Sequence, residues 1–185
     1  MSVKQARQAA SAEPAPMPSV RDARVLEDAF AQWQGELLGT LFYLVGNLED
    51  ARDALQDAFI KCWRNHEKLD DVKNLKAWIF RIALNSGRDV RETAWRRRRQ
   101  GLPEDETMLT SHEPPPDELL EQDERLTRLR TALAELRPEE QEVFLMRQNG
   151  ELTYEEIAET MGIPPGTVKT RMRLALTKLR EVLAE

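Results

Sequence analysis

Hydrophobic residues recur every three or four positions along most of the chain, and no segment alternates as a strand does. The pattern predicts three helices in the first half, at about 25–45, 48–66 and 74–99. Asn47 and Asn74 are the expected N-caps of the second and third. The predicted buried faces are Leu26, Phe30, Trp33, Leu37, Leu41 and Leu44; Ala51, Leu55, Phe59, Cys62 and Trp63; and Leu75, Trp78, Ile79, Ile82, Ser86 and Val90.

A different pattern, between Thr153 and Arg180, predicts a helix, a tight turn and a second helix. Thr153 and Glu156 have the spacing of a capping box, and Gly162 is placed to end the first helix in a left-handed conformation. Pro164, Pro165 and Gly166 form the turn, and the chain is expected to become helical again near Thr167. The buried side of this last helix is then Val168, Met172, Ala175 and Leu179, and the opposite side is Lys169, Thr170, Arg173, Leu174 and Thr177.

The segment from Gly166 to Arg180 holds five cations and no acid, in a chain whose net charge is −6. A basic second helix after a tight turn is typical of proteins that insert a helix into the DNA major groove. Its cations would contact phosphates, Arg173 could bind guanine, and Thr170 or Leu174 could contact a thymine methyl group. The alternative interpretation is a solvated basic face on a helical hairpin.

The negative charge is concentrated in the middle of the chain. Residues 101–127 contain nine acids and one base, and three consecutive prolines occupy 114–116. This composition predicts an all-α protein of two small helical domains joined by a flexible acidic linker. The expected boundaries are a disordered tail at 1–24, a first domain at 25–100, the linker at 101–116 and a second domain at 117–185.

The sequence favours a binding protein over an enzyme. His66 and His112 are the two histidines, Cys62 lies on a predicted buried face, and neither a glycine-rich phosphate loop nor a metal-ligand spacing is present. We therefore expect no cofactor, no metal and no catalytic residue. The single cysteine and the lack of a signal sequence or a long apolar segment suggest a cytoplasmic protein without membrane insertion.

Two blocks of sequence, GNLEDARDALQDAFIKCW with LKAWIFRIALN and ALAELRPEEQEVFLMRQNGELTYEEIAETMGIPPGTVKTRM, resemble the extracytoplasmic-function (ECF) sigma factors of bacterial RNA polymerase. The resemblance covers most of the chain beyond the tail and the linker. It implies a transcription initiation factor whose first domain, sigma region 2, docks on core polymerase and opens the minus-10 promoter element. Its second domain, sigma region 4, would recognise the minus-35 element as duplex.

The resemblance also implies functional residues. Those for minus-35 recognition are Thr167, Lys169, Thr170, Arg171, Arg173, Leu174, Thr177 and Lys178. Those for minus-10 recognition and melting are Lys73, Asn74, Lys76, Arg81, Asn85 and Arg88. Those for docking on the coiled coil of the large polymerase subunit are Gln56, Asp57, Ile60 and Lys61. The implied partners are core polymerase, through its clamp coiled coil and flap, promoter DNA, and an anti-sigma factor for which the sequence itself holds no sign.

The chain departs from the family pattern at two places. Many members have an aromatic and a basic residue where this chain has Leu69 and Asp70, followed by Asp71, and two carboxylates would repel single-stranded DNA. Leu174 and Leu176 replace residues that are often basic, so isolated DNA binding should be weak. Two other interpretations remain: a stand-alone helix-turn-helix regulator that binds duplex tightly without polymerase, and a pure interaction protein that acts as a decoy. The four arginines at 96–99 could contact phosphate or simply complement the helix dipole.

Overall fold

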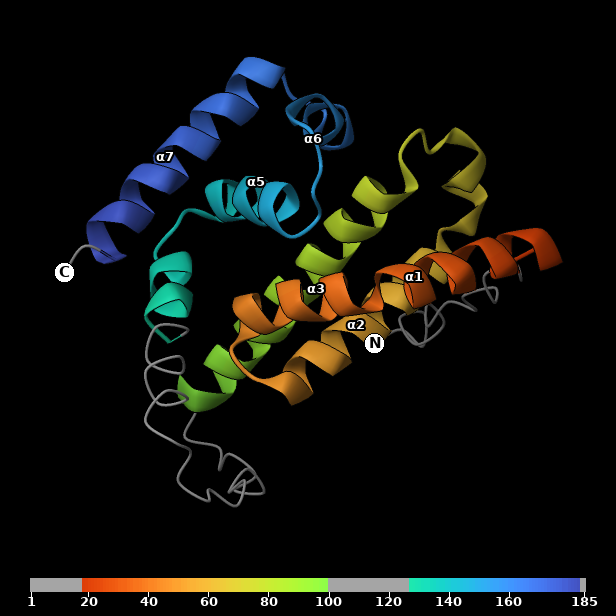
Figure 1. Ribbon diagram of the computed structural model, residues 1–185. Coiled ribbons are helices and arrows are strands. Elements are labelled where there is room, and N and C mark those ends of the chain that lie inside the picture. Colours follow the sequence, from red (N-terminus) through yellow and green to blue (C-terminus); the bar gives the residue numbers. More distant parts are fainter. Residues whose placement is uncertain (1–17, 100–126, 184–185) are drawn as a thin grey trace, which may run out of the picture.

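The computed structural model describes residues 18–99 and 127–183, and in these ranges the chain is helical with short connections and no strand (Figure 1). The predicted all-α class is confirmed. The predicted linker, 101–116, and most of the predicted tail, 1–24, lie outside the described residues. The elements in order are α1 (Val20–Val45), α2 (Leu48–Arg64), the 3₁₀ helix η1 (His66–Asp71), α3 (Leu75–Arg99), helical residues 127–134, α5 (Pro138–Gln148), α6 (Tyr154–Met161) and α7 (Pro165–Leu183).

Helix α1 begins at Val20 rather than near Val25, so residues 20–24 form its first turns and do not belong to a disordered tail. The Ser19 hydroxyl oxygen accepts a hydrogen bond from the Asp22 amide at 3.1 Å. A serine cap followed by an acid in the first turn stabilises a helix start. The hydrophobic periodicity could not show this, because the buried stripe begins only at Leu26.

Helix α2 packs through small side chains. Ala51, Ala54 and Ala58 are fully buried, whereas Leu55 and Phe59, predicted to lie in the core, are only partly buried. Ala51 and Cys62 are buried as predicted, but Trp63 too is only partly buried. The buried face is thus shifted toward the alanines, because small residues let the axes of neighbouring helices approach closely. The predicted N-cap of α2 is confirmed: the Asn47 side-chain oxygen accepts a hydrogen bond from the amide of residue 50 at 2.8 Å.

Helix α3 lies close against α1. Asn74 caps it as predicted, accepting from the Ala77 amide at 2.9 Å. A Cβ atom placed on Gly87 would lie 2.7 Å from a methyl carbon of Leu44 and 2.8 Å from one of Leu41. Phe80 is fully buried, and Trp78, which was predicted to be inward, is only partly buried.

Residues 18–99, with α1, α2, η1 and α3, are here the first unit, and residues 127–183 are the second. The second unit contains a helix-turn-helix, α6 and α7, whose predicted local signals are confirmed. Thr153 and Glu156 form the capping box of α6, and Gly162 ends it with a φ of 67°. Helix α7 starts at Pro165 rather than near Thr167, because proline fits the first position of a helix. Its predicted inward residues are all buried, namely Val168, Met172, Ala175 and Leu179.

The two units pack against each other, with α3 of the first in contact with α5 and α6 of the second (Figure 1). Leu44, Ala77 and Leu84 of the first unit belong to the same buried cluster as the core of α5, α6 and α7. None of the helices within the two described ranges is long and apolar enough to cross a membrane.

Candidate nucleic-acid interface

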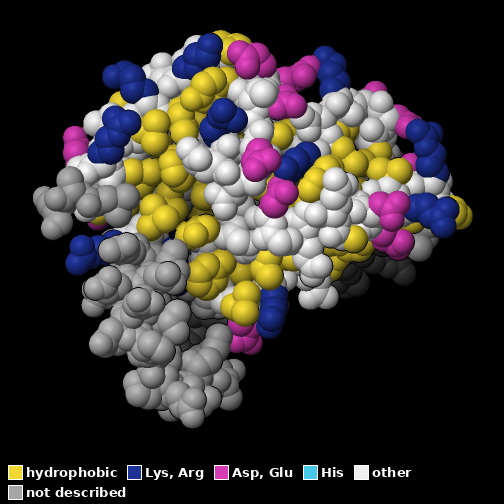
Figure 2. Space-filling view, in the orientation of Figure 1, with side chains coloured by type: hydrophobic (Ala, Val, Ile, Leu, Met, Phe, Trp, Pro, Cys, Tyr) yellow, Lys and Arg dark blue, Asp and Glu magenta, His cyan; other side chains and the backbone are white. Residues whose placement is uncertain are grey.

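The outer face of α7 carries the residues that the sequence placed there. Lys169, Thr170, Arg173 and Thr177 are exposed, and Leu174 is 37% exposed. Figure 2 shows Lys and Arg side chains spaced over the part of the surface that α7 occupies in Figure 1, with hydrophobic side chains between them. A convex helix with cations and a few apolar atoms on one side matches the requirements of a major groove.

Two threonines on this face bind back to their own helix. The Thr170 hydroxyl donates to the Gly166 carbonyl at 2.9 Å, and the Thr177 hydroxyl donates to the Arg173 carbonyl at 3.0 Å. Each hydroxyl oxygen keeps acceptor capacity and each side chain presents its methyl group. Contacts from these positions to a base are therefore either acceptance of a hydrogen bond or apolar contact with a thymine methyl group.

Lys178 is held against α5. Its ammonium lies 2.7 Å from the Glu140 carboxylate, whose side chain is 4% exposed. The predicted DNA contact of Lys178 thus competes with an ion pair inside the unit. Thr167 and Arg171, also predicted to contact DNA, are half-buried at the edge of the exposed face.

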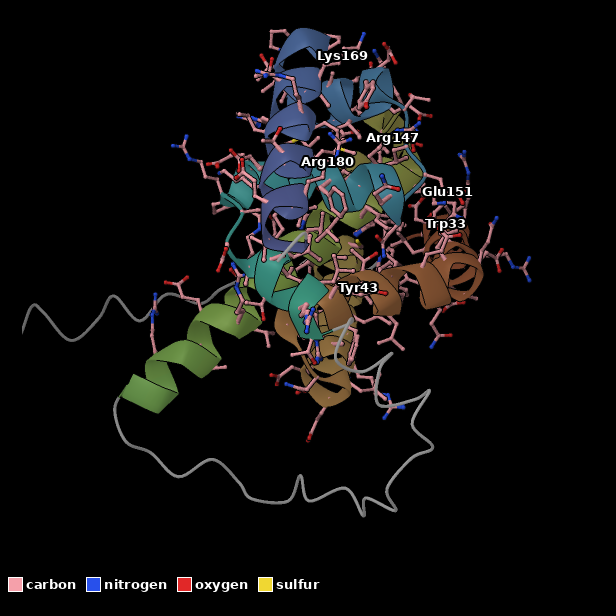
Figure 3. The ribbon with its side chains drawn as sticks, turned by 60° about the vertical axis from the view of Figure 1, so that its left-hand side comes forward. Trp33, Tyr43, Arg147, Glu151, Lys169 and Arg180 are labelled. Atoms are coloured by element: carbon pink, nitrogen blue, oxygen red, sulfur yellow. The ribbon has the colours of Figure 1, made fainter. Side chains whose placement is uncertain are left out.

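A cluster at the start of α6 was not predicted from the sequence. The Arg147 guanidinium lies 5.5 Å from the centre of the Tyr154 ring, and the Lys169 ammonium lies 5.9 Å from it. Figure 3 shows Lys169 at the beginning of α7 and Arg147 on the neighbouring α5. Arg147 also donates to the Leu152 carbonyl at 3.1 Å. Because Arg147 precedes the helix-turn-helix pattern, its position beside Lys169 could be found only from the packing of α5.

A second candidate site is a hollow of about 320 Å³ between α2, η1 and α3. It combines an aromatic side chain, two amides and three cations, which is the composition of a pocket for an unstacked base and its phosphate. Its lining consists of Lys61, Asn65, Lys68, Trp78, Arg81, Ile82 and Asn85. Asn65 and Lys68 were not predicted as site residues, because they lie in and beside the 3₁₀ helix rather than on the long helix.

Comparison with known proteins identifies both units. The family described as "Sigma-70 region 2" matches residues 29–100, and the one described as "Sigma-70, region 4" matches residues 126–179, together more than half of the chain. The chain belongs to the sigma-70 family of RNA polymerase sigma factors. Promoter-directed initiation by RNA polymerase is the function of that family, so the function predicted from the sequence is confirmed and the stand-alone regulator is not favoured.

Individual relatives place the chain in the extracytoplasmic-function (ECF) group of that family. The ECF RNA polymerase sigma factor RpoE of Cereibacter sphaeroides is 32% identical over 163 residues, covering 87% of this chain and 87% of RpoE. The ECF sigma factor SigE of Mycolicibacterium smegmatis is 31% identical over 144 residues, which are 78% of this chain and 56% of SigE. A solved structure of CnrH, in complex with the cytosolic domain of CnrY, shares the fold at a TM-score of 0.61 and 23% identity, covering 88% of this chain and 89% of that one.

The other residues predicted for the minus-10 function of this sigma factor lie apart from the hollow. Lys76 is 2.6 Å from the Glu36 carboxylate and within 6 Å of the Trp33 and Phe80 rings, with a side chain that is 20% exposed. Lys73, Asn74 and Arg88 face the second unit. The structure therefore groups Arg81 and Asn85 around the hollow and leaves the remaining four elsewhere.

The predicted docking residues lie on two sides of α2. Gln56 and Ile60 are exposed, and Gln56 borders an apolar hollow of about 530 Å³ between α1 and α2. Lys61 instead points toward α3, with its ammonium 2.8 Å from both the Asp57 and the Asp89 carboxylates. Burial alone would lower the pKa of Lys61, but hydrogen bonds to Asp57 and Asp89 raise it above its usual value.

The hollow beside Gln56 gathers apolar and polar side chains. It is lined by Phe30, Ala31, Gln34, Leu38, Arg52, Leu55, Gln56 and Phe59. Leu55 and Phe59 are therefore available to a partner because the alanines of α2 take their place in the core. Within residues 18–99 and 127–183 no group of three His, Cys, Asp or Glu side chains is placed to hold a metal ion.

Proposed function

We propose that this sigma factor divides promoter recognition between two surfaces and works without catalysing a reaction. The exposed face of α7 recognises the minus-35 duplex, and the hollow bordered by Trp78 and Asn85 holds an unstacked base of the minus-10 strand. The observation that carries the proposal is the outward face of α7, on which Lys169 and Arg173 are exposed with no acid between Gly166 and Arg180.

At the minus-35 element, base contacts come from the middle of the face. The Arg173 guanidinium can donate two hydrogen bonds to a guanine, and Leu174 together with Thr170 provides apolar contact for thymine methyl groups. Lys169, which lies beside Arg147 and Tyr154, binds a phosphate of the DNA backbone. This contact fixes the position of the helix on the duplex. Arg171 and Lys178 at the edges of the face supply further phosphate contacts.

At the minus-10 element, the hollow supplies three kinds of contact to one nucleotide. The half-buried Trp78 ring provides a stacking surface, the exposed Asn85 amide provides a donor and an acceptor for a base edge, and Arg81 provides charge for the phosphate. Lys68 opposite them offsets the repulsion expected from the carboxylates of Asp70 and Asp71.

Polymerase docking uses the outer surface of α1 and α2. Leu55 and Phe59 form an apolar floor, and Gln56 and Ile60 border it with exposed side chains. An amphipathic coiled coil presents apolar and polar groups alternately, which suits such a surface. Asp57 takes part from the edge, while Lys61 acts mainly by holding α2 to α3.

Two further features follow from the family. The protein functions in the cytoplasm, where core polymerase and promoter DNA are found. Regulation by an anti-sigma factor is supported by the related fold of RpoE from Bartonella quintana, a sigma factor solved in complex with the anti-sigma factor NepR.

Transcription from a library of promoter variants, with core polymerase and purified protein, tests the division of roles. Arg173→Ala should weaken the preference for particular bases in the minus-35 element and leave the minus-10 preference unchanged. The loss should be about 1–3 kcal/mol of discrimination against the wrong base at the contacted position. Asn85→Ala should relax preference within the minus-10 element alone. If both variants change the same element, or neither does, the assignment of the two surfaces is wrong.

A further inference from the structure

Lys61 joins α2 to α3 at the edge of the hollow assigned to the minus-10 base. Its ammonium lies 2.8 Å from the Asp57 carboxylate, one turn earlier on α2, and 2.8 Å from the Asp89 carboxylate on α3. It also donates to the Ser86 hydroxyl oxygen of α3 at 3.1 Å. Ser86 is fully buried, so the ammonium reaches the inside of the contact between the two helices. We call these three contacts the Lys61 bridge.

The bridge uses the full hydrogen-bonding capacity of the ammonium. A lysine ammonium carries three donor hydrogens, and three oxygen atoms lie within 3.1 Å of the Lys61 nitrogen. Burial alone would raise the pKa of Asp57, but hydrogen bonds from Lys61 and Ser86 hold it below its usual value, so this carboxylate stays charged. Although Lys61 lines the hollow, its donor hydrogens are therefore committed to the protein rather than to a DNA phosphate or the polymerase.

Two walls of the hollow adjoin the bridge. On α3, Ser86 directly follows Asn85, the residue proposed to contact the base edge. On the α2 side, the Asn65 amide nitrogen donates to the Lys61 carbonyl at 2.8 Å, and Asn65 also lines the hollow. A movement of Lys61 relative to Ser86 would therefore change the separation between Asn65 and Asn85.

The bridge should matter more for geometry than for stability. The Asp57 and Asp89 side chains are 44% and 68% exposed, and ion pairs open to solvent contribute little to the free energy of unfolding. Recognition of a base by hydrogen bonds is more demanding, because the contacting groups must be held within about 0.5 Å of their productive positions. Apolar packing holds this edge only in part, since Trp78 and Ile82 beside the hollow are partly buried.

We propose that Lys61 is a positioning residue for minus-10 recognition, whose bridge to Asp57, Ser86 and Asp89 fixes the place of Asn85 relative to the α2 wall of the hollow. The family resemblance assigns Lys61 to polymerase docking, whereas here it acts through Asn85. The inference rests on the proposed role of the hollow in holding a minus-10 base, and the variants are chosen so that the two can fail separately.

Transcription with core polymerase and the full chain, from promoters changed at single positions, measures discrimination against the wrong base. Lys61→Met keeps the apolar stem and removes the three donors. It should lower discrimination within the minus-10 element by about threefold or more, as for coupled residues of one network. Minus-35 discrimination and affinity for core polymerase should not change. Arg64→Met, which removes the same charge from an exposed position on the next turn of α2, should leave both discriminations intact.

A double variant shows whether Lys61 acts through Asn85. Asn85→Ala alone should lower the same minus-10 discrimination. Adding Lys61→Met should then lower it by less than about twofold further, because an amide that is absent cannot be misplaced. Asp89→Asn removes the charge at the α3 end of the bridge from an exposed position, and should give a smaller loss at the same promoter position. It keeps the test open if urea unfolding shows that Lys61→Met is not folded.

The outcomes separate the positioning role from its alternatives. Weaker binding of Lys61→Met to core polymerase would return Lys61 to the docking surface and overturn the proposal. Unchanged minus-10 discrimination in the folded bridge variants, equal losses in Lys61→Met and Arg64→Met, or additive losses with Asn85→Ala would also overturn it. If Asn85→Ala itself leaves minus-10 discrimination unchanged, the proposed role of the hollow fails, and the positioning role falls with it.

Discussion

The Lys178 ammonium lies 2.7 Å from the Glu140 carboxylate and thereby joins the recognition helix α7 to the first turn of α5. Glu140 also accepts from the Arg137 amide at 3.2 Å. Burial alone would raise the pKa of Glu140, yet these two hydrogen bonds hold it below its usual value. Lys178 is thus a structural residue of the second unit as well as a candidate phosphate contact.

Removing the Glu140 charge should destabilise the second unit. Glu140→Gln keeps a hydrogen-bonding side chain but leaves Lys178 without its partner, and the free energy of unfolding should fall by about 1 kcal/mol, because Lys178 is partly exposed to solvent. Glu139→Gln, at the neighbouring exposed position, should change it by less than about 0.5 kcal/mol. Urea unfolding of both variants measures the difference, and equal values would mean that the ion pair contributes nothing.

The helix-turn-helix should lose stability in acid because of Glu156. Hydrogen bonds from the Thr153 amide, and then from its hydroxyl, hold the pKa of Glu156 below its ordinary value of 4.5. A carboxyl group whose pKa is lower in the folded than in the unfolded chain stabilises the folded state. This stabilisation is fully present above the pKa of the unfolded chain and is lost as the pH falls through the pKa of the folded chain. Urea unfolding gives the free energy of unfolding at pH 7 and at pH 3.5. The loss of this free energy between the two pH values should be smaller for Glu156→Gln than for the unchanged chain. A difference of the same size in both would contradict the assignment.

The caps and the apolar stripe of α7 could be predicted because they are local. Asn47, Asn74 and the Thr153–Glu156 pair bind backbone groups within three residues, so spacing alone is enough. The inward face of α2 could be predicted only in part: Ala51 and Cys62 are buried as expected. Leu55 and Phe59 are not, because hydrophobicity ranks them above alanine while close helix packing favours alanine. The contact of Lys73 with Glu159 was also out of reach, since it joins residues far apart in the chain with no local signal.

Glycine at position 87 should be required for the packing of α3 on α1. The added methyl group of Gly87→Ala would lie within 3 Å of Leu41 and Leu44, and the resulting strain should exceed the gain in helix propensity, for a net loss of about 1 kcal/mol. Gly35→Ala, in α1 with nothing within 4 Å, should instead gain up to about 1 kcal/mol. Thermal unfolding compares the two; stabilisation by both substitutions would contradict the packing.

The Cys62 thiol should be inert in the folded protein. It is fully buried on α2, and desolvation raises its pKa to about 12. Because the thiolate is the reactive form, a disulfide reagent at pH 8 should modify it only as fast as the protein unfolds. The reaction is followed by absorbance with and without denaturant. Rapid modification of the native protein would show that α2 opens locally.

The most direct test of the whole account is run-off transcription with purified core polymerase. The chain should direct start-specific transcripts from a subset of promoter fragments, and Lys169→Glu with Arg173→Glu should reduce them by about tenfold or more, as expected when two cations that face DNA phosphates or bases are reversed. Arg21→Glu with Arg24→Glu, two exposed positions at the start of α1, changes the net charge equally and should leave transcription intact. Transcripts that do not depend on the chain, or an equal loss in both double variants, would contradict promoter recognition by α7.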